Sequence, residues 1–227
     1  MVRAFIIGNG QSRLALDLNN LRGKGTIYGC NALYRDFNGI DVLVATDDKM
    51  REEIELTELH PDYPNVPATI PFYTRRPNKL IKCSPERPWQ EKDHEQRSSR
   101  KIDDNVWGYS SGSVAMWYAC QPGGGTENHE LNHMYIYFIG FDLLGTGDNS
   151  KVINNIYAGT NAYKPQNATA IYHMNWVEQI RKIMLEFDKI NFARVGPYNN
   201  FTPEQWSQVP NYREISFLDF EKEINNV

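Results

Sequence analysis

Short apolar runs alternate with polar or amphipathic segments along the first third of the chain. Residues 3–8 (RAFIIG) form an apolar run that ends in a glycine turn, which is typical of a buried parallel strand leading into a loop. The same pattern predicts further strands at 26–30, 41–45 and 68–73, with helices between them at 13–21 and 48–58. Strands that alternate with helices at this spacing predict βαβ units, a parallel sheet and right-handed crossovers.

The second half of the chain continues the alternation. Helical composition over 109–120 is followed by a strand at 134–139 (MYIYFI), whose aromatic and β-branched content suits a central position. The apolar residues over 176–187 then recur at the spacing of an amphipathic helix. A strand at 189–195 follows, and Thr202-Pro203-Glu204 predicts a helix with a threonine N-cap and a proline at its first position.

Two polar segments interrupt this pattern, one over about 84–105 and one over 145–169. Eleven of the 22 residues from 84 to 105 are charged, so this segment is either a solvated insertion or a lid over a site. We find no internal repeat and no domain linker. The sequence therefore predicts a single Rossmann-like domain over 1–227, with a doubly wound, mostly parallel α/β sheet and the two insertions as candidate lids.

Composition and charge exclude several classes of protein. The chain has 227 residues and a net charge of −4, which argues against tracking duplex nucleic acid with a basic face. Its longest apolar stretch, 134–144, falls short of the roughly 20 residues that a membrane span needs. Three distant cysteines without a CxxC motif indicate a reducing compartment, so we expect a cytoplasmic protein. Homo-oligomerisation is left open.

The turn over residues 8–12 (GNGQS) is the sharpest local signal. It joins a predicted strand to a predicted helix, and the backbone N–H groups of such a turn can bind a phosphate at the positive end of the helix. The dinucleotide pattern GxGxxG is not met because residue 13 is Arg, so NAD binding is disfavoured. A phosphate-binding turn and a merely tight turn both stay open.

Charged residues follow the third and fourth predicted strands, at the edge where open α/β sheets bind ligands. A carboxylate of Asp47 or Asp48 can hold Mg²⁺ on a diphosphate or bond a ribose hydroxyl, whereas Asp48 can also simply cap the next helix. The basic residues beyond the fourth strand either meet an anion or form a solvated loop, which we favour: Arg75, Arg76, Lys79 and Lys82.

Two histidine patterns suggest chemistry. HELNH at 129–133 matches the HExxH zinc motif, but it lies between a glycine-rich turn and a strand, so we favour a polar surface loop. His173 begins the apolar stripe of the helix over 176–187, where the helix dipole disfavours imidazolium and keeps the ring able to accept a proton. A packed or capping histidine is the alternative.

Several segments together resemble the sialyltransferases of glycosyltransferase family 42. They are IIGNGQS near the N-terminus, CNALY at 30–34, SSG at 110–112, YFIGFD at 137–142, and His173 ahead of the turn GPYNN at 196–200. The match covers about residues 3–202. The cluster GCNALYRDF is also similar to uncharacterised bacteriophage proteins, which indicates the cytoplasm of a bacterial or phage-infected host cell.

The resemblance implies a Rossmann-like fold and the transfer of sialic acid from CMP-sialic acid to a hydroxyl acceptor, with no metal required. It assigns His173 as the general base of an inverting, in-line attack. The residues it brings to the nucleotide and its phosphate are Gly8, Asn9, Gly10, Ser12, Asn31, Ser111 and Gly112.

Three positions depart from the family's pattern. Where the family has a tyrosine that stabilises the leaving phosphate, this chain has Leu144. An arginine of the family is replaced by Gly108, and an asparagine after the third strand is replaced by Asp47-Asp48. Tyrosines in the second insertion or just after it can substitute for the first of these: Tyr157, Tyr163 or Tyr172. The carboxylates fit a different nucleotide-activated sugar, with Mg²⁺.

Two other functions are kept open. The chain also resembles the archaeal-type hydroxymethylpterin pyrophosphokinases, which implies that Asp47, with Asp48 beside it, holds the Mg²⁺ of ATP and that His173 has no role. A non-catalytic nucleotide-binding protein is the third interpretation. Leu144 and Gly108 support it, because a fold by itself does not establish an activity.

Overall fold

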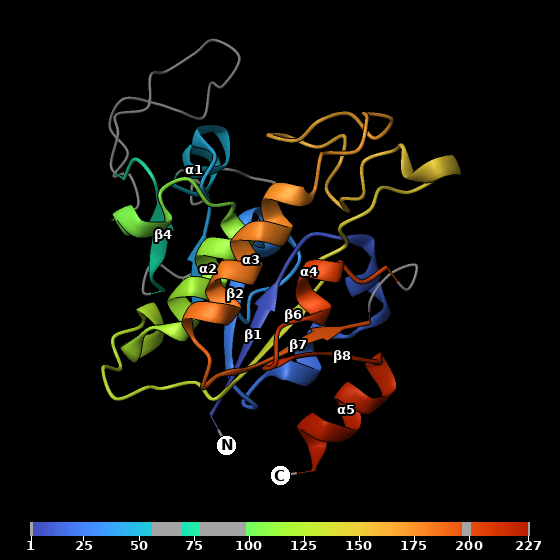
Figure 1. The fold of residues 1–227 in the computed structure, drawn as a ribbon. Helices are drawn as coiled ribbons and strands as arrows, with labels where there is room; N and C mark the ends of the chain where they lie inside the picture. Colours follow the sequence, from blue (N-terminus) through green and yellow to red (C-terminus); the bar gives the residue numbers. More distant parts are fainter. Residues whose placement is uncertain (1, 56–69, 78–98, 197–200, 227) are drawn as a thin grey trace, which may run out of the picture.

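The computed structural model describes residues 2–55, 70–77, 99–196 and 201–226. Their strands form one sheet in the order β5-β4-β3-β2-β1-β6-β7-β8, and every neighbouring pair is parallel. The strands are β1 (Arg3–Ile7), β2 (Thr26–Cys30), β3 (Val42–Val44), β4 (Phe72–Thr74), β5 (Arg100–Lys101), β6 (Tyr135–Ile139), β7 (Asn191–Val195) and β8 (Tyr212–Ile215). The predicted doubly wound α/β fold is confirmed (Figure 1).

The direction in which strands are added reverses beside β1. The chain first places β2, β3, β4 and β5 on one side of β1, and then places β6, β7 and β8 on the other. Ile7 pairs with Gly29 of β2 and with Ile139 of β6, so the three strands end side by side. Open α/β sheets bind ligands at such a reversal, outside the carboxyl ends of the strands.

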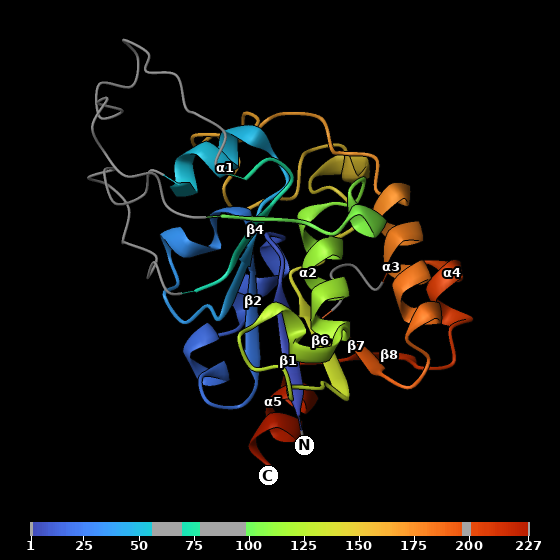
Figure 2. The same cartoon turned by 90° about the vertical axis from the view of Figure 1, so that its left-hand side faces the viewer.

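Helices cover both faces of the sheet (Figures 1 and 2). One face packs against α2 (Ser111–Cys120), α3 (Met174–Glu186) and α4 (Glu204–Ser207), and the other against α1 (Asp48–Glu55) and α5 (Phe217–Asn225). Alternate residues of β1 enter the two cores: Ala4 and Ile6 the first, Phe5 and Ile7 the second. Because both faces are covered, a strand of this sheet reads as a continuous apolar run.

Two predicted helix starts differ from the structure. Instead of one helix over 13–21, the chain forms two 3₁₀ helices, η1 (Gln11–Ala15) and η2 (Leu18–Leu21). Asp17 caps η2, since its side chain accepts a hydrogen bond from the N–H of Asn19 (2.9 Å). The helix α4 is a single turn that begins at Glu204 with Pro203, and not Thr202, as its N-cap.

The structure describes the two polar insertions to different extents. Most of the first, 84–98, lies outside the described residues, and the remainder contains β5 and the start of η5 (Asp104–Val106). The second, 145–169, is largely irregular, with isolated bridges from Val152 to Thr146 and Thr169. The sequence did not predict β8 and α5, whose N-cap is Ser216. No helix in the described part of the chain is long and apolar enough to cross a membrane.

Candidate functional site

A cleft of about 570 Å³ opens at the carboxyl ends of the central strands. Residues just beyond the ends of four strands line it: Gly8–Gly10 after β1, Asn31 after β2, Thr46 and Asp47 after β3, and Gly140–Gly145 after β6. The cleft thus lies at the reversal beside β1, and its volume is in the range of about 300–1,000 Å³ that small-molecule sites occupy.

The glycines of the first turn allow the ends of β1 and β6 to touch. The N–H of Gly8 donates to the carbonyl oxygen of Ile139 (2.8 Å), and the N–H of Gly10 donates to that of Gly140 (2.9 Å). A Cβ at Gly8 would lie 2.6 Å from the carbonyl oxygen of Gly140. A Cβ at Gly10 would lie 2.6 Å from the carboxylate of Asp142. Close backbone approach therefore explains both glycines without a ligand.

The chain's own carboxylate occupies the N-terminal end of η1. Asp142 is buried and accepts hydrogen bonds from the N–H of Ser12 (2.8 Å) and from its hydroxyl (2.5 Å). The neighbouring N–H of Gln11 donates to Asn154 Oδ1 (2.9 Å). The donors that the resemblance assigns to a phosphate at Ser12 are thus used inside the protein. Ser12 holds Asp142, and it is Asp142 that lines the cleft.

Two other predicted ligand residues are brought together from distant parts of the sequence. Asn31, directly after β2, accepts a hydrogen bond at Oδ1 from the hydroxyl of Ser111, at the start of α2 (2.8 Å). The backbone N–H of Thr46, after β3, donates to the same hydroxyl oxygen (3.0 Å). Asn31 adopts a φ of +53°, a left-handed conformation that asparagine tolerates better than most residues other than glycine. These contacts fix the start of α2 at the cleft.

The N-terminus of α2 offers hydrogen-bond donors to this cleft. Among the described residues, no group accepts a hydrogen bond from the N–H groups of Ser111, Gly112 and Ser113, the first three of the ten-residue helix, and the first two of these residues line the cleft. The preceding N–H, that of Ser110, donates to Gln179 Oε1 of α3 (2.9 Å). Free N–H groups and the helix dipole together favour an anion at this position. Gly112 permits the phenyl ring of Phe141 to approach, since a Cβ there would lie 2.9 Å from that ring.

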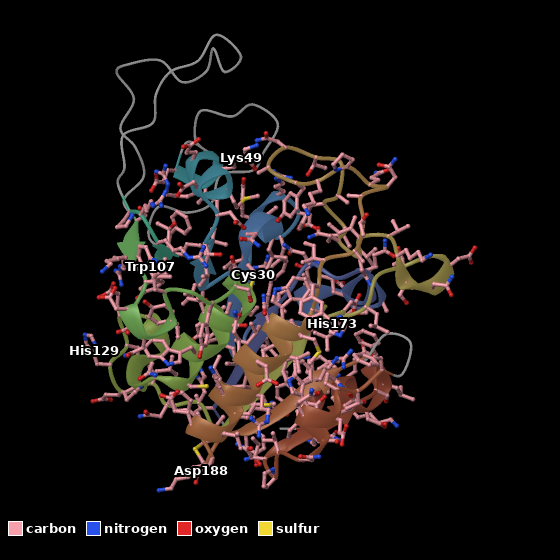
Figure 3. The ribbon with its side chains drawn as sticks, turned by 45° about the horizontal axis from the view of Figure 1, so that its top comes forward. Cys30, Lys49, Trp107, His129, His173 and Asp188 are labelled. Atoms are coloured by element: carbon pink, nitrogen blue, oxygen red, sulfur yellow. The ribbon has the colours of Figure 1, made fainter. Side chains whose placement is uncertain are left out.

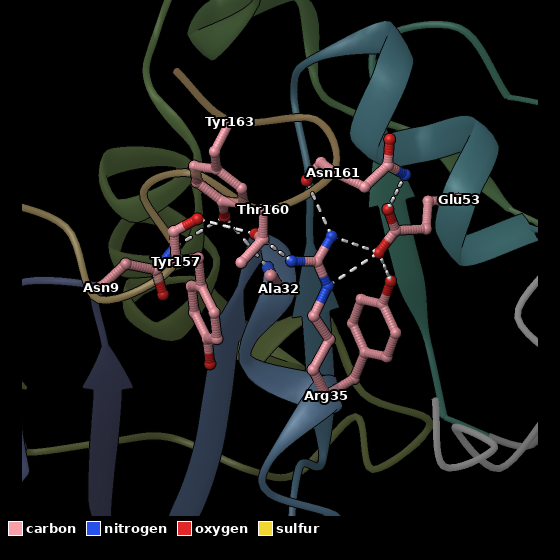
Figure 4. A network of polar contacts seen from close by, with 9 residues as sticks. Asn9, Ala32, Arg35, Glu53, Tyr157, Thr160, Asn161 and Tyr163 are labelled. Carbon is pink, nitrogen blue, oxygen red and sulfur yellow. Dashed lines mark hydrogen bonds and ion pairs between the residues drawn. The ribbon is translucent and has the colours of Figure 1, made fainter. Parts of the chain in front are cut away.

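The second insertion forms one wall of the cleft and is tied to Arg35 and to Glu53 of α1 by a polar network (Figure 4). The guanidinium of Arg35 donates to Glu53 (2.6 and 2.8 Å), to Thr160 Oγ1 (2.6 Å) and to the carbonyl oxygen of Asn161 (2.9 Å). Glu53 also accepts hydrogen bonds from Tyr34 and from the side chain of Asn161. This part of the predicted lid is therefore anchored.

The three candidate tyrosines occupy different places. The hydroxyl of Tyr163, which lines the cleft, accepts from Asn9 Nδ2 (3.1 Å) and from the N–H of Ala32 (3.3 Å). Burial raises the pKa of Tyr163, so its hydroxyl stays protonated. Tyr157 is not among the described residues that line the cleft, and its hydroxyl lies between Arg13 (2.6 Å) and Asp36 (2.5 Å). Tyr172 is 70% exposed. Tyr163 is the only tyrosine among the described residues that line the cleft.

His173 is the N-cap residue of α3 (Figure 3) and is close in sequence to residues that line the cleft. Its ring meets the ring of Phe201 edge-on at 5.6 Å between centroids. Partial burial lowers the pKa of His173, which keeps the ring neutral near pH 7. Its neighbours Ile171, Asn175 and Trp176 line the cleft, whereas His173 is not among the described residues that do.

The two carboxylates after β3 have different surroundings. Asp47 is exposed and lines the cleft, whereas Asp48 forms an ion pair with Arg76 (2.6 Å). Within the described ranges, no group of three or more His, Cys, Asp or Glu side chains is arranged to hold a metal ion. A divalent cation would therefore rely on Asp47 and on oxygens of its own ligand. Cys30 also lines the cleft, but burial raises the pKa of its thiol to about 12, which keeps it unreactive.

The HELNH string is not a zinc site. Residues 129–133 are irregular, so the two histidines do not share a helical face. The ring of His133 is buried, with Nδ1 at 2.8 Å from the carbonyl oxygen of Ala119 and Nε2 at 3.0 Å from Thr26 Oγ1. Burial lowers its pKa. His129 lies at the periphery of the molecule, far from His173 (Figure 3). The loop interpretation holds, with His133 as an internal structural residue.

Arg75 is the cleft residue that sequence reasoning undervalued. It follows β4 directly and lines the cleft, whereas the sequence favoured a solvated basic loop. Of the other basic residues in that stretch, Arg76 pairs with Asp48, and Lys79 and Lys82 lie outside the described residues. Its position one residue past a strand end, at the ligand-binding edge, was the available signal.

No protein-family model, curated protein or solved structure matches the chain. The fold and the site themselves define its class: an α/β protein with a polar cleft at the strand-order reversal of a doubly wound parallel sheet.

Proposed function

We propose that the cleft binds a nucleotide-activated sugar and that the protein is an inverting glycosyltransferase acting on a hydroxyl acceptor. The observation that carries this proposal is the set of acceptor-free N–H groups at the start of α2, held in the cleft by Asn31 and Thr46 through Ser111. They favour the phosphate of an activated sugar, which is the group that leaves in the reaction.

The proposed chemistry follows from these positions. The acceptor hydroxyl attacks the anomeric carbon of the sugar while the bond from that carbon to the phosphate oxygen breaks. The N–H groups of Ser111 and Gly112 stabilise the negative charge that develops on the departing phosphate. His173, neutral near pH 7, receives the proton of the hydroxyl, a role that typically contributes about 10²–10⁴-fold to a rate.

Asp47 favours a second candidate, Mg²⁺-dependent diphosphate transfer from ATP. Its exposed carboxylate lines the cleft, and no hydrogen bond or ion pair joins it to the described part of the chain. Oxygen ligands of this kind suit Mg²⁺ bound to a phosphate chain. The position of His173, which is not among the described residues that line the cleft, is also compatible with a protein that binds a nucleotide without transferring it.

Thermal unfolding with a nucleotide panel tests these functions. CMP, UMP, UDP, GDP and ATP are each added with Mg²⁺ and with EDTA. A ligand at 100 times its Kd stabilises the native state by about 2.7 kcal/mol, or roughly 5–10 °C for a chain of this size. We expect a shift with a pyrimidine nucleotide that survives EDTA. A shift with ATP alone, abolished by EDTA or by Asp47→Asn, would favour diphosphate transfer.

The role of His173 is tested separately from binding. His173→Ala is expected to leave nucleotide binding within about twofold and to abolish hydrolysis or transfer of the sugar by the protein. Binding with equal turnover in wild type and variant would exclude His173 as the base. Binding with no turnover of any sugar nucleotide in the wild type would leave the non-catalytic function.

A further inference from the structure

The guanidinium of Arg75 is fixed in the cleft by two backbone carbonyls. Its Nε donates to the carbonyl oxygen of Trp107 (2.7 Å), and its Nη2 donates to that of Tyr109 (2.9 Å). Figure 3 shows Trp107 on the segment that leads from β5 to α2. The side chain therefore reaches from the end of β4 to the residues directly before the helix whose N–H groups have no acceptor.

This anchoring leaves most of the guanidinium's donors unused. A guanidinium has five N–H donors, and the two carbonyls take one from Nε and one from Nη2. No acceptor in the described part of the chain faces the other three. Arg75 lines the cleft together with Gly108, the residue between the two whose carbonyls it binds. A guanidinium held this way presents a preorganised fork, the geometry that binds phosphate oxygens.

A second group in the same cleft also lacks a partner. Asn9 lines the cleft and is only 9% exposed, yet its Oδ1 has no hydrogen-bond donor, although its Nδ2 donates to Tyr163. A buried acceptor without a partner costs free energy, but this oxygen is itself closed off from the cleft, so the group that Asn9 offers to a ligand is not its Oδ1. The groups left for a ligand are therefore the unused donors of Arg75 and of α2, which fit an anion.

We propose that Arg75 and the first N–H groups of α2 bind one phosphate group between them, and that Arg75 is the residue that selects a charged ligand for the cleft. The proposal deepens the proposed function and rests on it for the part that concerns nucleotides. The part that concerns phosphate does not depend on it, because the same donors bind inorganic phosphate. Phosphate attached to a nucleoside and free phosphate share this chemistry, and the experiment separates them.

The test compares Arg75→Ala with the matched variant Arg76→Ala. Arg76 is the next residue and carries the same charge, but it pairs with Asp48 at the surface, where its side chain is 56% exposed. Titration calorimetry measures inorganic phosphate, CMP and UDP, and the uncharged nucleosides cytidine and uridine. Arg75→Ala is expected to weaken phosphate and nucleotide binding by about 10- to 100-fold and nucleoside binding by less than about twofold. Arg76→Ala should change none of these by more than about twofold.

Arg75 also braces the segment before α2, so a second neutral variant guards against misfolding. Arg75→Gln keeps an amide donor for one carbonyl and is expected to show the same selective loss. Equal losses for nucleosides and nucleotides, or unchanged phosphate and nucleotide affinity, would overturn the proposal. If phosphate binds through Arg75 and no nucleotide binds, only the proposed function falls. If wild type binds neither phosphate nor any nucleotide, both fall.

Discussion

The hydrogen bonds between Ser12 and Asp142 make a sharp prediction, because they decide whether the first glycine turn is structural or ligand-binding. Ser12→Ala removes the donor of a 2.5 Å hydrogen bond to a buried carboxylate and keeps the backbone bond of 2.8 Å. A hydrogen bond to a charged group contributes about 1.5–3 kcal/mol, so we expect a loss of about 2 kcal/mol in the free energy of unfolding. For a chain of this length that corresponds to about 4–8 °C in Tm.

The measurement is thermal and urea unfolding of the ligand-free protein. Ser207→Ala is the matched control: its exposed hydroxyl donates to the carbonyl oxygen of Glu204 (2.8 Å), and its loss should cost less than about 0.5 kcal/mol. Nucleotide affinity of Ser12→Ala should stay within about threefold of wild type. A variant as stable as wild type that has lost nucleotide binding would refute the reasoning and return Ser12 to the phosphate.

Two further predictions concern buried polar groups. Tyr163→Phe leaves Asn9 Nδ2 and the N–H of Ala32 without their acceptor, so the free energy of unfolding, measured by urea titration, should fall by about 1–3 kcal/mol. An unchanged urea midpoint would show that the two donors bind water instead. Burial lowers the pKa of His133 below its usual value of about 6.5, so the unfolded state binds its proton first and stability should fall as pH drops below about 6.5. His133→Asn should flatten that part of the pH–stability curve between pH 7 and 5, and a variant curve parallel to that of wild type would contradict the assignment.

The strands were predictable where both faces are covered. RAFII of β1 and YIYFI of β6 are continuous apolar runs because helices pack on either side of them. The edge strands follow another pattern: β8 (YREI) carries charged residues, and β5 is two exposed basic residues. Such polar sequences look like those of loops, so the hydrophobic pattern does not predict edge strands of this kind. Periodicity did not predict the two 3₁₀ helices after β1, because the N-cap that Asp17 provides for η2 is a local feature.

The candidate site was predictable only where it depends on strand ends. Asn9, Asn31, Asp47 and Ser111 reach the cleft because each follows a strand or opens a helix at the ligand-binding edge. Their partners depend on contacts between residues far apart in sequence: 130 residues separate Ser12 from Asp142. No local pattern contains such a pairing. Sequence reasoning therefore placed residues at the cleft without telling which of them are already hydrogen-bonded inside the protein.

Two helix N-termini lie near this cleft, and their N–H groups differ in whether the protein itself supplies an acceptor. At η1, Asp142 already supplies the anion, and a phosphate brought to about 4 Å from that carboxylate would meet a repulsion of about 4 kcal/mol at an effective dielectric constant of 20. At α2, the N–H groups have no acceptor among the described residues, and the Arg75 guanidinium is anchored to the carbonyls just before them. A glycine turn after the first strand is where dinucleotide-binding folds hold their pyrophosphate. Here the same turn is closed by a carboxylate, so we expect an anion to bind at the start of α2 and not at this turn.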